Sequence, residues 1–124
     1  MIKTLFVILA LSASALSFNT AFAHTDKPKH GGVVQAASDL SFELVPKGDV
    51  ATIYIEDHGK PFPTAGMTGK LTVLNGSDKS EAELKPAGEN RLEAKGVKVG
   101  KGSKAVASMS TPKKKTISVR FAVK

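Results

Sequence analysis

Alternation of apolar and polar residues, broken at short intervals by turn residues, is the feature that most constrains the fold of this chain. The clearest run lies near the C-terminal end, where Ile117, Val119 and Phe121 alternate with smaller or polar residues. Successive side chains of a β-strand point to opposite faces, so this pattern predicts strands with one buried face. Similar strands are expected at residues 33–35, 40–44, 51–56, 71–73, 82–84, around Leu92, and at 105–109.

Turn residues separate these runs. Ser38-Asp39 and Asn75-Gly76 mark hairpins, and the segment 57–61 (Asp-His-Gly-Lys-Pro) interrupts the third run. Seven or eight short strands at regular spacing favour an all-β fold, a single antiparallel β-sandwich over residues 31–124. A small closed β-barrel is the alternative.

The first 23 residues have the organisation of a secretory signal peptide. Lys3 gives a positive start, residues 5–16 are largely apolar, and Ala21-Phe22-Ala23 forms a small-x-small cleavage site. We expect a signal helix that is cleaved after Ala23, so that 101 of the 124 residues remain and the mature chain begins at His24. The mature protein is expected in a periplasm or outside the cell, without a stable membrane anchor.

The polar segment 24–30 is expected to be a flexible N-terminal arm that folds down when a metal ion binds. It carries two of the three histidines of the chain, His24 and His30.

Composition narrows the function classes. The chain has no cysteine, so metal ligands are restricted to His, Met, Asp, Glu or main chain. With one tyrosine, no tryptophan and little arginine, nucleic-acid binding is not expected. The formal net charge of +7 comes from lysine, which favours solubility and leaves attraction to an acidic membrane face or an anionic partner open. The sequence has no nucleophile elbow, HExxH motif or phosphate-binding loop, so we expect no enzyme.

The histidines point to metal binding. A terminal His24 would offer its α-amino group and its imidazole as one chelate, a nitrogen-rich arrangement that copper(II) favours. His30 and His58 lie outside the apolar strand faces, and imidazole is the commonest protein ligand for transition metals. The alternative is that both are ordinary surface histidines.

Two further residues complete the candidate metal set. Asp57 could add a carboxylate oxygen beside His58, and Met67 could add a thioether for copper(I). Met67 stands in a glycine-flanked segment (Ala65-Gly66-Met67-Thr68-Gly69) that is as compatible with an exposed loop as with the core. The candidate metal ligands are therefore His24, His30, His58, Met67 and Asp57, with copper expected and zinc, cobalt or nickel as alternatives.

Several stretches resemble a small exported domain that occurs alone or fused to the adaptor subunits of bacterial heavy-metal efflux systems. They are His30-Gly31-Gly32 and residues 40–44, 53–61, 64–74 and 84–92. The resemblance implies a periplasmic β-domain concerned with copper, zinc, cobalt or nickel, and His30 and His58 match the histidines of this pattern. Together with the candidate ligands, we expect a metal-binding protein that buffers copper or delivers it to an efflux system, with an efflux adaptor subunit as a candidate partner. The alternative is a module that docks to an adaptor or an anionic surface through its lysines and binds no metal.

Overall fold

Residues 27–124 are described by a computed structural model, and they fold into nine β-strands without a helix. The predicted signal peptide (residues 1–23) and His24 lie outside the described residues. The strands are β1 (Val33–Ala37), β2 (Leu40–Lys47), β3 (Val50–Asp57), β4 (Lys60–Pro61), β5 (Thr68–Asn75), β6 (Asp78–Pro86), β7 (Arg91–Lys95), β8 (Lys104–Ser110) and β9 (Thr116–Ala122). In this part of the chain no helix is long and apolar enough to cross a membrane.

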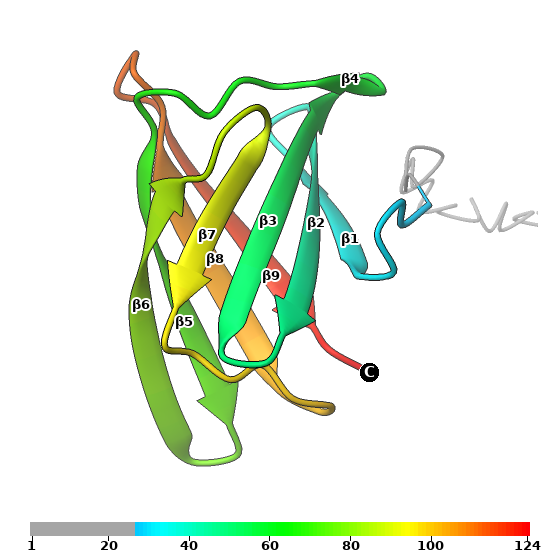
Figure 1. Cartoon of the computed structure of the whole chain (residues 1–124), viewed down its shortest axis with the longest axis vertical. Coiled ribbons are helices and arrows are strands. Elements are labelled where there is room, and N and C mark those ends of the chain that lie inside the picture. Colours follow the sequence, from blue (N-terminus) through cyan, green and yellow to red (C-terminus); the bar gives the residue numbers. More distant parts are fainter. Residues whose placement is uncertain (1–26) are drawn as a thin grey trace, which may run out of the picture.

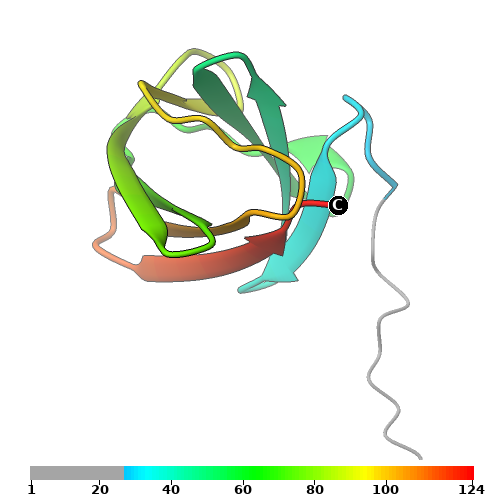
Figure 2. The ribbon, with the colours of Figure 1, turned by 90° about the horizontal axis from the view of Figure 1, so that it is seen from below.

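All strand pairs are antiparallel, in the order β1-β2-β3-β7-β6-β5-β8-β9, with β4 paired to β3 (Figure 1). β6 joins two groups of strands, because it pairs with β5 along most of its length and with β7 through Lys85 and Pro86. The first and last strands of this order, β1 and β9, contact each other. Figure 2 shows the resulting ring of strands. The predicted all-β antiparallel fold is confirmed, and its nearly closed outline approaches the barrel alternative.

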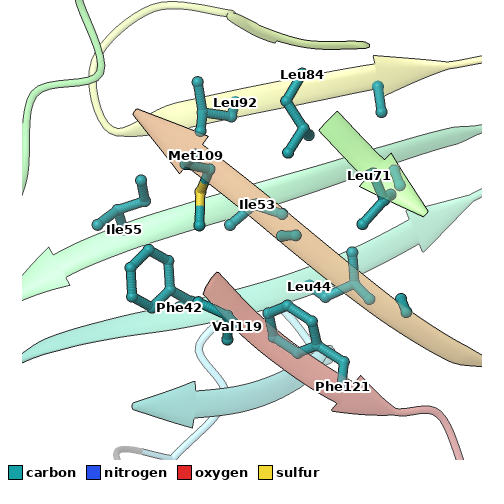
Figure 3. Close-up of a cluster of buried hydrophobic side chains, with 14 of the residues drawn as sticks. Phe42, Leu44, Ile53, Ile55, Leu71, Leu84, Leu92, Met109, Val119 and Phe121 are labelled. Carbon is teal, nitrogen blue, oxygen red and sulfur yellow. The ribbon is translucent and has the colours of Figure 1, made fainter. Parts of the chain in front are cut away.

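The core lies inside this ring. Phe42 pairs with Ile55 across β2 and β3, and Leu44 pairs with Ile53, so both pairs project to the interior. The other strands of the ring supply the residues that pack against them, and the cluster includes Leu71, Leu84, Leu92, Met109, Val119 and Phe121 (Figure 3). Burial of each large apolar side chain contributes about 1.5–3 kcal/mol. Without disulfides, this core is the main source of stability.

The connections gather at two ends of the barrel (Figure 1). The end that carries the β1–β2, β3–β4 and β8–β9 turns is called the upper end. The lower end carries the β2–β3 turn (48–49), the β5–β6 turn (76–77) and the β7–β8 loop (96–103). At the upper end, His58 has a φ of 51° and Gly59 a φ of 82°, the pair of positive values typical of a two-residue type I′ hairpin turn.

A glycine brings the chain before β1 close to β2. A Cβ on Gly32 would lie only 2.2 Å from the carbonyl oxygen of Leu44, so a side chain is not tolerated there. This close approach places residues 29–32 on the outer surface of the barrel.

Candidate metal-binding site around His30 and Glu43

The structure separates the predicted metal ligands. His30 lies before β1 on the outer side of the barrel, whereas Asp57 and His58 lie at the end of β3, at the upper end. Met67 immediately precedes β5 and is 1% exposed, within the core. His24 lies outside the described residues.

Glu43 is the residue around which the site is built. It lies between inward-facing Phe42 and Leu44 on β2, so its side chain belongs to the outer face of the sheet, yet it is only 5% exposed. Residues 29–32 cover it, and this is why a charged group on the outside of the barrel is buried.

The carboxylate of Glu43 accepts four hydrogen bonds from the covering segment. The backbone N–H of Lys29 donates to Oε1 at 3.0 Å, and the N–H groups of His30 and Gly32 donate to Oε2 at 2.8 and 2.9 Å. The ring Nδ1 of His30 lies 3.0 Å from Oε1. In addition, Lys29 Nζ lies 2.6 Å from Oε2 of Glu56 on β3. The part of the predicted arm that the structure describes is thus held against β2 and β3 by the protein's own groups.

These contacts keep Glu43 ionised. Burial alone raises the pKa of its carboxyl group, but the hydrogen bonds from Gly32, the His30 ring and the backbone of His30 and Lys29 together lower the pKa below its ordinary value. An ionised carboxylate only accepts hydrogen bonds, so Nδ1 of His30 must carry the proton that they share. In this tautomer of the neutral imidazole, Nε2 carries the lone pair.

The His30 ring is held from a second side by Tyr54. The two rings are stacked, with centroids 3.7 Å apart and an interplanar angle of 6°. Tyr54 on β3 is the cross-strand partner of Glu43 on β2. Neighbouring strands thus fix both the position and the tautomer of one imidazole, whose side chain is 41% exposed. Within residues 27–124, Nε2 has no hydrogen-bond partner.

This arrangement is the one that metal-binding histidines commonly have. Such a histidine usually donates its other ring N–H to a carboxylate or carbonyl, which orients the ring and raises its basicity. Glu43 can therefore act as the supporting carboxylate for a metal ion bound at Nε2 of His30.

Asp57 and His58 repeat the pairing in an exposed setting. Nδ1 of His58 lies 2.6 Å from Oδ1 of Asp57, and the side chains are 83% and 51% exposed. Here Asp57 faces the histidine ring. Asp57 also lines an open cavity of about 500 Å³ at the upper end, together with residues that include Leu40, Phe62, Lys113, Lys115 and Ile117.

The two described histidines do not share one site. His58 follows Tyr54 by four residues, which corresponds to about 13 Å along an extended strand. Among residues 27–124, no group of three or more His, Cys, Asp or Glu side chains is arranged to hold a metal ion. A metal ion at His30 therefore needs a ligand from elsewhere, and among the predicted ligands His24 remains for that role.

The sequence analysis missed Glu43 and Tyr54. Both fall in alternating strand runs at positions that read as ordinary outward-facing residues. The only local signal was His30-Gly31-Gly32, whose second glycine permits the close approach to β2.

Comparison with known protein families, with characterised proteins and with solved structures finds no match to this chain. The resemblance to domains of heavy-metal efflux systems stays a prediction that rests on the short motifs of the sequence.

Proposed function

We propose that this is an exported, non-catalytic metal-binding protein whose N-terminal segment binds copper, with Nε2 of His30 as one ligand. The observation that carries the proposal is the pairing of His30 Nδ1 with the buried Glu43 at 3.0 Å, because it leaves Nε2 as the ligand nitrogen. The stacked Tyr54 keeps the ring from rotating away.

His24 supplies the further ligands in this proposal. After signal cleavage it would offer an α-amino group and an imidazole, six residues before His30. Three nitrogen ligands of this kind suit copper(II), and zinc, cobalt or nickel are the alternatives. The proposed site does not use Met67, because its thioether lies in the core. Asp57 and His58 form a separate, solvent-exposed candidate with fewer supporting contacts.

The proposed role is to buffer copper or to deliver it to a heavy-metal efflux or resistance system in the periplasm, with an efflux adaptor subunit as the partner. Part of the support is the sequence resemblance, and part is the exposure of His30, which allows a metal to enter and leave. A site on the outer face of a rigid barrel suits transfer better than permanent storage.

A copper titration of the purified protein, followed by native mass spectrometry, tests the proposal. The same spectra give the first residue of the mature chain. We expect one copper(II) per chain, and we expect His30→Asn to weaken binding by about tenfold or more. Glu43→Gln should weaken it by about 10–100-fold through the loss of the supporting carboxylate.

His58→Asn is the matched control. Asparagine tolerates the positive φ that His58 has in its turn, so this variant keeps the fold while it removes an imidazole. We expect its copper affinity to equal that of the wild type. Wild-type affinity in His30→Asn, or a loss only in His58→Asn, would reject the proposed site.

A further inference from the structure

Lysines gather at the lower end of the barrel. Six of them lie in its connections or at the strand ends that adjoin them, against two acidic residues, Asp49 and Asp78. The six are Lys47, Lys79, Lys95, Lys98, Lys101 and Lys104, and all are exposed. We refer to them as the lower-end lysines.

Hydrogen bonds hold these connections together as one surface. The N–H groups of Gly96 and Val97 donate to the carbonyl oxygen of Asp49 at 2.8 and 3.1 Å, which joins the β7–β8 loop to the β2–β3 turn. The side-chain amide of Asn75 donates to the carbonyl of Lys98 at 3.4 Å, which brings the same loop to the β5–β6 turn. Figure 2 looks onto this end, where the loop crosses the view. The connections that carry the lysines therefore lie side by side at one end of the barrel.

An exposed leucine lies among these charges. Leu74 is 38% exposed, and it is the one large hydrophobic residue exposed to this degree in the part of the chain that the structure describes. Its direct cross-strand partners are Lys79 on β6 and Lys104 on β8. Directly paired side chains have Cβ atoms about 4.5–5.5 Å apart, so an apolar side chain lies between two lysine side chains on one face.

Most of the positive charge has no internal partner. Lys79 pairs with Glu81 at 3.2 Å and Lys95 with Glu93 at 3.7 Å. The other four lower-end lysines form no ion pair within residues 27–124. An external anionic group can therefore approach them without displacing an existing contact.

We propose that the lower end is a docking surface for an anionic lipid membrane. Lysine is attracted to such a membrane by its charge, and several lysines together bind additively. Leu74 and the methylene stems of Lys79 and Lys104 can enter the interfacial region of the bilayer while the ammonium groups remain at the phosphates. An exposed apolar side chain among the lysines favours a lipid surface over an acidic protein, because the interface of an anionic bilayer accepts both apolar side chains and positive charge.

The proposal is independent of the proposed metal site. His30 lies on the side of the barrel and His58 at the upper end, so neither belongs to the docking surface. Docking through the lower end leaves both histidines accessible.

Vesicle co-sedimentation tests the proposal. The probes are vesicles of phosphatidylcholine alone and of phosphatidylcholine mixed with phosphatidylglycerol. We expect the wild-type protein to sediment only with the mixed vesicles and to be released by salt. The variant Lys98→Glu/Lys101→Glu/Lys104→Glu should bind about tenfold more weakly or worse.

The β8–β9 turn provides a matched control. Lys113→Glu/Lys114→Glu/Lys115→Glu changes the net charge by the same amount at the opposite end of the barrel, and we expect it to retain most of the binding. Leu74→Ser should weaken binding several-fold without any change of charge. It provides a second test of the docking surface if the triple variant does not fold.

Three results would overturn the proposal. One is absence of wild-type binding to the mixed vesicles, and another is equal loss in the two triple variants, which would indicate net charge alone. The third is that the wild type binds immobilised polyglutamate through the lower-end lysines but does not bind vesicles. That result would indicate an acidic protein partner.

Discussion

The imidazole of His30 lies flat on the phenol ring of Tyr54, 3.7 Å from centroid to centroid and 6° from parallel. The same imidazole faces Glu43, the residue paired with Tyr54 across β2 and β3. One cross-strand pair thus holds a histidine that precedes the first strand. This contact joins the N-terminal segment to the barrel, and it is the basis of the first two predictions.

Replacement of Glu43 by glutamine should destabilise the protein. The glutamine side chain has the same size, but its NH₂ group is a donor and replaces one of the two oxygens that accept from backbone N–H groups. We expect the free energy of unfolding in urea to fall by about 1–3 kcal/mol. Glu83→Gln is the control, because the Glu83 side chain is 67% exposed, and it should change stability by less than about 0.5 kcal/mol. Similar effects of the two changes would show that Glu43 does not anchor the segment.

The contribution of Glu43 should also depend on pH. Its pKa in the folded protein lies below the ordinary value of 4.5, so the unfolded chain takes up a proton more readily. The stabilisation is therefore complete above pH 4.5 and is lost as the pH falls through the lower folded-state pKa. The difference in unfolding free energy between wild type and Glu43→Gln should narrow in acid. A constant difference from neutral pH down to pH 3 would contradict the assignment.

Met67 should behave as a core residue. Met67→Ala is expected to cost about 2–5 kcal/mol of stability, whereas Met67→Leu, which preserves volume, should cost less than about 1.5 kcal/mol. Thermal unfolding of the two variants measures this. Because the thioether is buried, Met67→Leu should also leave copper(I) affinity unchanged. A folded Met67→Leu variant that no longer binds copper(I) would restore Met67 to the ligand set.

Replacement of Lys114 by glycine should raise the stability of the folded protein. Its φ of 62° lies in the left-handed region, where its N–H donates to the carbonyl of Thr111 at 2.8 Å to close the β8–β9 turn. Relief of this backbone strain should raise stability by about 0.5–1 kcal/mol in Lys114→Gly. Lys113 has no positive φ, so Lys113→Gly should be neutral or destabilising. A rise in melting temperature for Lys113→Gly but not for Lys114→Gly would contradict this account of the turn.

The alternating pattern was sufficient to find most of the strands. The expected strand at 51–56 corresponds to Val50–Asp57, and the one at 71–73 is the centre of Thr68–Asn75. Strand ends extend further because pairing with neighbours continues into polar residues. Segment 57–61 was expected only to interrupt the third strand, but its last two residues pair back onto β3 as β4.

Barrel closure and the candidate site depend on contacts between distant parts of the chain. Pairing of β6 with both β5 and β7 bends one group of strands onto the other. The local sequence of β6 does not predict this double pairing. Burial of Glu43 depends on a segment 11–14 residues away, so β2 alone predicts an exposed carboxylate. Met67 was ambiguous because glycine flanks a buried residue as readily as an exposed one.

β1 and β9 contact each other but stand at the two ends of the hydrogen-bonded strand order. Each of these strands ends the hydrogen-bonded order, so releasing either breaks pairing on one side only, and local unfolding costs less there than in the interior strands. β1 begins one residue after Gly32, whose N–H is held by Glu43. A ligand that strengthens this hold would therefore slow amide hydrogen exchange along β1 first and leave the exchange of the core strands unchanged. Copper binding at His30 would thus slow amide hydrogen exchange in β1, a strand that contributes no ligand to the metal.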